Sequence, residues 1–600
     1  MSDALVPVAS GSPAVSPSSP PSSDRAPRSI HPPRDPSAPP PAAGLRGVWS
    51  RVTREPNAIW MREMRQSARL ARTPWILFTL VLVLTLVLSS IGGLTASSGT
   101  SPAELGGALF QIFFGLAYFV VVLVGPTVAA NGIAAEREGR TWEAVLLTGM
   151  TPKEIARGKF LAAYTTMAIY LVALAPVGAL SFLFGGVTAG EVVIAFAFLF
   201  LLAALVVAFG LAVSSFMSNL RGAIVITLML AAVLGPMLFS VGGFGCSLIA
   251  HKLWPDVPEG MPIWLPLAYQ RAAFGVDYAV LLVMFPLLLV AIPAWFLYEA
   301  TIANLTGEAD DRSTGLKRWF AITTPIAAVA GSVPSLLVSD YDGRTGLCIA
   351  GIVVYVLHIF LCAMLFTAEP PGPSRRIEVR WRRSSAGTMT RFLGPGLFRT
   401  MLLVVFMAVV GVAFIAVIDG VGVALYGTGT SAIKERSLDQ IAVVAAYVTP
   451  YCVFVIGLLA WLRARNASPW VPRIIAVGVF FLVAVAPWVV AAITGVLADS
   501  SAKAWILLAS PSPFFLVSML SEIGSYTHET PMLVPVGMIF SLGWGALGLM
   551  FLSVAKHRSD KIVGERDAIQ KRSDEAYAAE ERAAAQPPAA EPTLEPQTNE

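Results

Sequence analysis

The chain has 600 residues, of which 56% are hydrophobic and only 13% are charged, and its formal net charge is +4. Soluble globular domains carry about 25% charged residues, so this composition excludes a soluble chain and indicates a membrane protein. The small positive charge does not indicate nucleic-acid binding, because the basic residues flank the apolar segments, as they do at membrane boundaries.

Residues 1–45 are rich in proline, serine and alanine. They offer too little apolar surface to offset the entropy of ordering, so we predict a disordered N-terminal tail. The following basic stretch, 51–72, has the pattern of an amphipathic helix lying on the inner leaflet with its arginines reaching the headgroups. Its candidate membrane-contacting residues are Trp60, Arg62, Arg65 and Arg69. The alternative is a basic flank that only fixes topology.

Twelve apolar segments follow, each long enough to cross a bilayer as a helix. They are residues 74–94, 106–130, 160–184, 192–216, 223–244, 279–298, 319–338, 346–367, 400–418, 441–462, 474–497 and 532–555. The sequence therefore predicts an all-α, polytopic membrane helix bundle. Lysine and arginine concentrate in alternate loops, which places both termini in the cytoplasm by the positive-inside rule.

Residues 131–160, between the second and third apolar segments, are dense in charge. Trp142, Val145 and Leu146 are spaced to share one helical face. Thr151, with a proline next and Glu154 three residues later, has the pattern of a capping box that starts a new helix. The stretch therefore predicts a helix–turn–helix elbow at the membrane surface. The alternative is an ordinary solvated loop.

The run EREGRTWEAVLLTGMTPKEIARGKF in this elbow resembles the signature of ABC-2 type transporter permeases. In that family the elbow is a coupling helix that docks onto a nucleotide-binding subunit, and an interfacial helix precedes the first span. The resemblance implies docking through Glu136, Arg137, Glu138, Thr141, Glu143 and Leu147.

The same resemblance implies a permease subunit that moves an unidentified substrate, by export, across the plasma membrane, which in bacteria is the inner membrane. Its partners would be a cytoplasmic ABC ATPase, which holds the ATP, and membrane lipid. Whether a homodimer or a second permease completes the pathway is open.

The second half repeats the loop rhythm of the first. We interpret residues 46–318 as a six-span ABC-2-like half with the elbow 131–160, and residues 319–556 as a degenerate second half. The charged cytoplasmic tail, 557–600, should be helical at first and disordered at its end. The inner loop 367–400 holds seven arginines but lacks the acidic-Gly-Thr-Glu cluster, so ATPase docking by the second half is open.

No catalytic, cofactor-binding or metal-binding residues are predicted, and the chain is not expected to be an enzyme. The pair Gly158-Lys159 is followed by Phe160 and lacks the glycine pattern of a P-loop, so ATP hydrolysis is assigned to a partner. The predicted spans hold no charged residue at membrane depth, with Glu299 and Asp419 near ends, which disfavours an ion-coupled secondary transporter. A non-transporting membrane scaffold remains an alternative.

Overall fold

The computed structural model describes residues 56–69, 72–99, 101–244, 251, 253–256, 269–270, 272–383, 387–498, 503–524 and 531–585. The predicted disordered tails, 1–45 and 586–600, lie outside these residues. The chain divides into Met1–Pro56 and Asn57–Glu600, and all the structure below belongs to the second unit.

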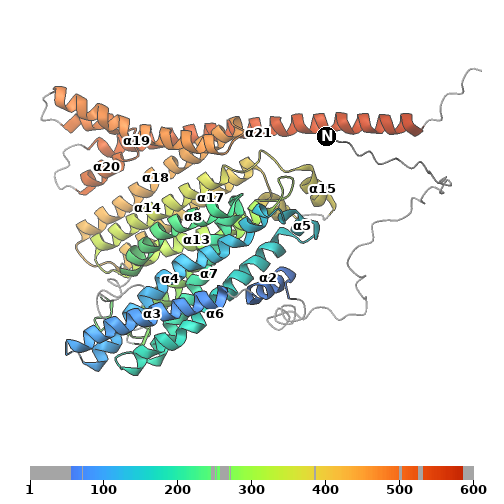
Figure 1. Ribbon diagram of the computed structural model, residues 1–600. Coiled ribbons are helices and arrows are strands. Elements are labelled where there is room, and N and C mark those ends of the chain that lie inside the picture. Colours follow the sequence, from blue (N-terminus) through green and yellow to red (C-terminus); the bar gives the residue numbers. More distant parts are fainter. Residues whose placement is uncertain are drawn as a thin grey trace, which may run out of the picture. The chain divides into compact units, whose positions relative to one another are not determined.

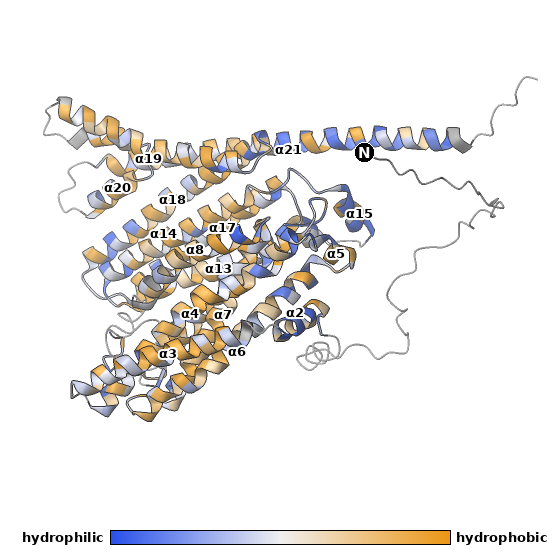
Figure 2. Ribbon diagram, in the orientation of Figure 1, coloured by the Kyte–Doolittle hydropathy of each residue, from blue (hydrophilic) through white to orange (hydrophobic). Residues whose placement is uncertain are grey.

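The prediction of an all-α membrane bundle is confirmed: twelve of the described helices are long and apolar enough to span a bilayer. Figure 2 shows apolar residues along these helices and polar residues at the end that carries α2, α5 and α15. The span helices are α3 (Arg72–Ser97), α4 (Pro102–Glu138), α6 (Pro152–Leu183), α7 (Ala189–Phe216), α8 (Leu220–Met237), α12 (Phe285–Leu305), α13 (Thr314–Leu336), α14 (Tyr341–Phe366), α17 (Leu397–Tyr426), α18 (Ser431–Arg465), α19 (Trp470–Ala498) and α21 (Leu533–Ala585).

Shorter elements connect or extend the spans (Figure 1). A π-helical turn, η1 (Leu238–Phe244), extends α8, and α11 (Val276–Tyr278) with η2 (Ala279–Met284) leads into α12. The others are α2 (Ala58–Arg69), α5 (Trp142–Leu147), α15 (Arg375–Arg383), α16 (Thr388–Leu393), η3 (Lys503–Ala509) and α20 (Phe515–Gly524).

Three span helices begin with capping boxes, including the one predicted at Thr151, in which a hydroxyl accepts from the third backbone N–H and a glutamate reaches back. The pairs are Ser101 with Glu104, Thr151 with Glu154, and Thr188 with Glu191. These local signals set the starts of α4, α6 and α7.

Two large hydrophobic cores hold most of the described spans together, with smaller clusters beside them. The first is built from α4, α6, α7 and α12, and the second from α14, α17, α18 and α21. In both, the second span of the half contacts the third and fourth, the third contacts the fourth, and the fourth contacts the sixth. The two sets of six spans thus share this contact pattern, and their origin as two duplicated halves stays a prediction. The halves differ in the fifth span, since α8 packs on α4 whereas α19 packs on α18 and η3.

Helices α18 and α21 approach each other closely through two glycines. A Cβ on Gly457 would lie 2.2 Å from the carbonyl oxygen of Gly548, and a Cβ on Gly548 would lie 2.5 Å from the Cα of Phe454. Small residues at such crossings let helix backbones pack in a membrane.

We expect Gly457→Ala to lower the free energy of unfolding by about 1–3 kcal/mol, because the methyl group would push the α21 backbone away. The apparent thermal midpoint of purified protein in detergent measures this. The matched control is Gly478→Ala on α19, where an added Cβ would meet nothing within 4 Å. Equal midpoints for the two variants would contradict the close crossing.

Helix α21 is continuous over 53 residues and runs well past its apolar part (Figure 1), which confirms the helix predicted after residue 557. Its polar part is tied to the loop before α15. Ser559 donates to the carbonyl of Pro371 (2.6 Å), and Arg566 donates to that of Pro373 (2.7 Å). The tail therefore packs against the second-half inner loop.

Candidate functional site

The elbow consists of the end of α4, the six-residue helix α5 and the start of α6. Arg140, at φ 56°, and Gly149, at φ 72°, turn the chain on either side of α5 in left-handed conformations. On α5, Val145 is buried, whereas Glu143 is exposed and Leu147 is 87% exposed. One side of α5 thus packs on the protein and the other faces outward.

Beneath α5, a four-residue charge network joins three elements: Arg62 and Glu63 from α2, Glu136 from α4 and Lys159 from α6. The ammonium of Lys159 lies 2.7 Å from the carboxylates of both Glu63 and Glu136. The guanidinium of Arg62 lies 2.9 Å from Glu63 and also pairs with Glu136. The network therefore ties the helix before the first span to both arms of the elbow.

Because this network is largely buried, it contributes more to stability than a surface ion pair does. The side chain of Lys159 is only 3% exposed, and that of Glu136 is 13% exposed. Burial acts to raise the pKa of Glu63, but the charge and hydrogen bond of Lys159 outweigh it and hold that pKa below its ordinary value. The charged form of Glu63 is therefore the stable one in the folded protein.

Two further elbow residues are held by the turn between α7 and α8. Arg137 donates to the carbonyls of Ser215 (2.7 Å) and Met217 (3.1 Å). Glu138 accepts from the backbone N–H of Leu220 (2.7 Å), at the start of α8. The elbow is thus fixed on its second side by the turn between α7 and α8.

The placement revises the docking set that the resemblance implied. Glu136 and Arg137 are half-buried and engage their own chain, so they position the elbow, whereas Glu138 stays exposed while it accepts from Leu220. Thr141 is exposed and donates to the Glu136 carbonyl (3.3 Å), while the side chains of Glu143 and Leu147 are exposed and have no hydrogen bond or ion pair within the described residues. The sequence places Leu146 on one face with Trp142 and Val145, but Val145 is buried whereas Leu146 is 46% exposed and extends the outward surface.

Helix α2 exists as predicted, and it packs on α6. Trp60 donates through its indole N–H to the Thr165 hydroxyl (3.3 Å). Arg65 and Arg69 are exposed, as membrane-facing residues would be. Arg62 differs from its predicted role, because its guanidinium is held by the two carboxylates of the charge network instead of reaching headgroups. Whether α2 lies on the membrane stays a prediction.

A cavity of about 790 Å³ adjoins the charge network. Its polar end is formed by the network itself, and its apolar end includes Ile76, Val128 and Tyr170. The cavity lies among α2, α3, α4 and α6, next to the elbow.

Residues 95–295 match the family model described as ABC-2 family transporter protein. This part of the chain is an ABC-2 type permease domain. None of the curated proteins matches the chain. The match includes the whole elbow and the helices α4 to α8 that carry it.

With this domain and twelve helices able to span a bilayer, the chain is a multi-pass membrane protein that contains a membrane-transport domain. Members of this family are not themselves catalytic, and the family implies association with an ABC ATPase. The part of the chain after residue 295 lies outside the match, so its likeness to the first half comes from the helix pairing described above.

The described span helices carry more buried charge than the sequence predicts. Helices α6 and α13 begin before the apolar segments do, so Lys159 and Lys317 lie within them. Asp419 in α17 is also buried and accepts from the Ser335 hydroxyl (2.6 Å). The imidazole of His358 in α14 contacts the Thr324 hydroxyl of the neighbouring helix α13 (3.3 Å).

Proposed function

We propose that the chain is the permease subunit of an ABC-2 exporter, powered by ATP hydrolysis on a separate cytoplasmic subunit that docks on α5. The observation that carries this proposal is the outward surface of α5, formed by Glu143, Leu146 and Leu147 on a helix fixed from both sides. An exposed leucine pair beside a carboxylate is suited to a partner, since a purely solvated loop gains nothing from apolar side chains.

The charge network explains why docking would move the pathway. A push on α5 reaches α4 through Glu136, α6 through Lys159 and α2 through Glu63. Because these side chains are packed and paired, the three helices respond together. We propose that this unit converts ATPase closure into movement of the first-half spans.

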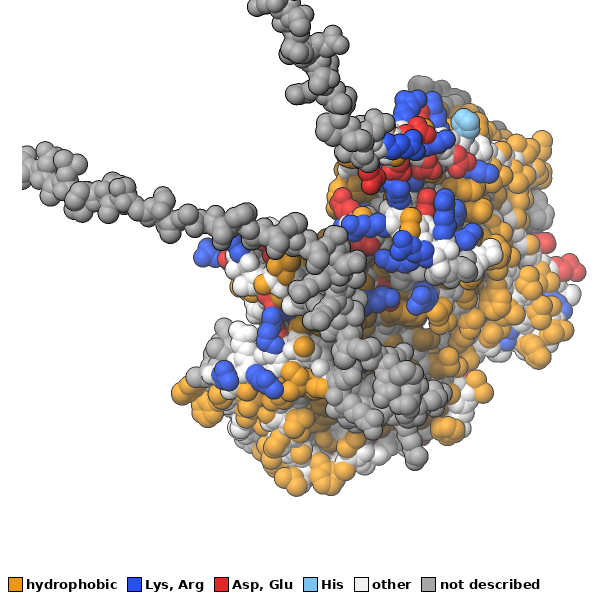
Figure 3. All heavy atoms as spheres, turned by 90° about the vertical axis from the view of Figure 1, so that its right-hand side faces the viewer, with side chains coloured by type: hydrophobic (Ala, Val, Ile, Leu, Met, Phe, Trp, Pro, Cys, Tyr) orange, Lys and Arg blue, Asp and Glu red, His pale blue; other side chains and the backbone are white. Residues whose placement is uncertain are grey.

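The proposed orientation places α2, α5 and α15 in the cytoplasm, with both termini on that side of the plasma membrane. Figure 3 views this end and shows lysine and arginine side chains gathered on it, above the apolar flanks of the spans. Cytoplasmic flanks of membrane helices carry the excess of these residues, which supports the orientation.

We expect Glu143→Ala and Leu147→Ala each to weaken ATPase retention in a pull-down, because central contacts of an interface typically cost about 2 kcal/mol or more when truncated. The measurement is the ATPase retained per permease after washing, together with ATP hydrolysis by the complex. Permease without the ATPase should hydrolyse no ATP above background.

The matched controls are Glu308→Ala, which removes another exposed carboxylate, and Met389→Ala, which removes an exposed apolar side chain in the second-half loop. Retention equal to wild type in all four variants would reduce α5 to an ordinary loop. Hydrolysis by the isolated chain would refute the separate-ATPase assignment.

A further inference from the structure

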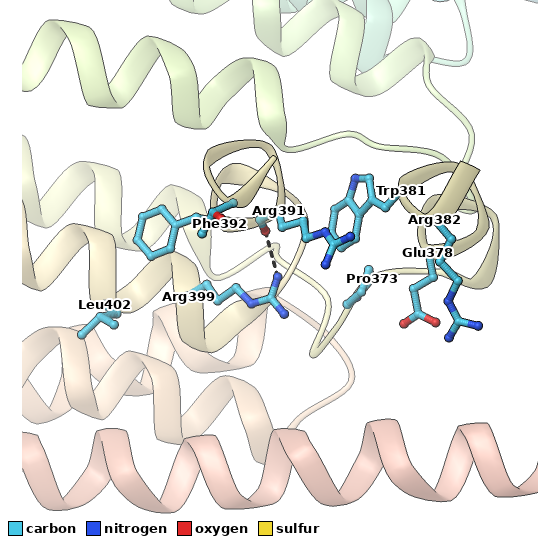
Figure 4. Close-up of a pocket in the computed structure, with 9 residues that line it drawn as sticks. Pro373, Glu378, Trp381, Arg382, Arg391, Phe392, Arg399 and Leu402 are labelled. Atoms are coloured by element: carbon cyan, nitrogen blue, oxygen red, sulfur yellow. Dashed lines mark hydrogen bonds between the residues drawn. The ribbon is translucent and has the colours of Figure 1, made fainter. Parts of the chain in front are cut away.

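The inner loop of the second half forms a pocket of about 560 Å³ between α15, α16 and the first turns of α17 (Figure 4). We name it the arginine pocket after three of its lining residues, Arg382, Arg391 and Arg399. Each comes from a different helix, so the fold and not a single basic run brings them together.

The charge in the arginine pocket is not neutralised by the described protein. The guanidinium groups of Arg382 and Arg391 have no hydrogen-bond or ion-pair partner in the part of the chain that the structure describes. Arg399 donates to the Arg391 backbone carbonyl (2.8 Å) and keeps its charge. The lining carboxylate, Glu378, already pairs with Arg566 of α21 (3.5 Å). The pocket therefore favours an anion.

The walls of the pocket are anchored. At the start of α15, Arg375 makes two hydrogen bonds to Asp574 of α21, at 3.0 and 2.8 Å. The Trp381 ring packs on Gly394, where a Cβ would lie 2.2 Å from the ring. The free arginines thus sit on a frame that other ion pairs and contacts hold in place.

The pocket is polar at one end and apolar at the other. Figure 4 shows Phe392 and Leu402 at one end, Arg382 with Glu378 at the opposite end, and Arg399 between them. From Leu402, which is 40% exposed, the outward surface of α17 continues through the exposed Phe406 and Val410. An apolar tail leaving the pocket would therefore run along a span helix into the bilayer.

We propose that the arginine pocket binds the phosphate-bearing headgroup of an anionic phospholipid from the adjacent leaflet, with an acyl chain along α17. Arginine recognises phosphate oxygens through paired N–H donors, and basic pockets beside membrane helices suit such headgroups. The apolar end and the lipid-facing surface favour a lipid over a soluble anion. This proposal does not depend on ATPase docking.

The test uses the purified full chain in detergent and counts bound phospholipid by mass spectrometry after exposure to mixed phosphatidylglycerol and phosphatidylcholine. Wild type should retain more phosphatidylglycerol than phosphatidylcholine. Arg382→Ala/Arg391→Ala should weaken this binding about 30-fold, as expected for two arginines near a membrane surface. Inorganic phosphate at millimolar concentration should not displace the lipid.

The matched control is Arg376→Ala/Arg383→Ala, which removes two exposed α15 arginines that do not line the pocket. It should keep the preference, and both double variants should keep the wild-type thermal midpoint. Equal loss in the two double variants would reduce the effect to general surface charge and overturn the proposal. Displacement by inorganic phosphate alone would also overturn it, because the site would then be one for soluble anions.

Discussion

Replacing Lys317 by methionine is expected to lower the free energy of unfolding of the second half by about 3–5 kcal/mol. Lys317 is fully buried, with its ammonium 3.3 Å from the carboxylate of Glu369 and donating to the Gly394 carbonyl (2.7 Å). Glu369 also accepts from the backbone N–H of Gly396 (3.2 Å). Without the lysine, the buried carboxylate of Glu369 loses its counter-charge.

The decisive comparison is the double variant Lys317→Met/Glu369→Leu. Replacing both members of a buried pair with apolar residues is often close to neutral, so the double variant should recover most of the lost stability. Apparent thermal midpoints from tryptophan fluorescence rank the stabilities of wild type, the single variant and the double variant. Lys561→Met, at an exposed position on α21, serves as control and should match wild type. A double variant as unstable as the single one would show that the pair acts by packing alone.

The second large effect is expected for Lys159→Met in the charge network. Removing this ammonium leaves Glu63 and Glu136 facing each other with only Arg62, at a cost of about 2–4 kcal/mol. We place the cost below that of Lys317 because the Glu63 side chain keeps 26% exposure. Hydrogen exchange of the α5 amides should quicken, since α4 and α6, the two arms that flank α5, lose an ion pair that ties them to α2. Lys153→Met, exposed on the same helix as Lys159, is the control.

Lys159→Met should also reverse the pH dependence of the stability of this region. In wild type the pKa of Glu63 is lowered, so its stabilisation is present above the unfolded pKa, near 4.3, and is lost as pH falls through the folded pKa. In Lys159→Met one carboxylate should have a raised pKa, and protonating it relieves the repulsion. The difference in free energy of unfolding between the variant and wild type should therefore become smaller as the pH is lowered from 7 to 5. A stability difference that does not change with pH would contradict the ion pairing in the charge network.

Much of the fold could be predicted because its signals are local. Each span is a run of apolar residues, and the starts of α4, α6 and α7 follow from a hydroxyl and a glutamate three residues apart. Helix ends were harder to place. Polar residues such as Glu138 and Lys159 continue a helix without any apolar signal, so the predicted spans were shorter than the helices.

The site was predicted only in part because its contacts join residues distant in sequence. A helical period places Glu136 and Arg137 on a polar face but does not reveal that α2 and the α7–α8 turn cover that face. The partner of Lys159, Glu63, lies 96 residues away, and nothing in either local pattern joins them. The same holds for the arginine pocket, since its three arginines meet only once α15 and α16 fold back on α17.

Helix α21 has a mechanical consequence. With no proline after Pro535, it is a stiff rod of about 80 Å, and its crossing with α18 at Gly548 gives it a pivot. A tilt of about 5° there would move Asp574 by about 3 Å, given a rise of about 1.5 Å per residue. Because Asp574 holds Arg375, that displacement would pull α15 along. A small displacement at the N-terminal end of α21 would therefore produce a displacement of α15 at the opposite membrane surface.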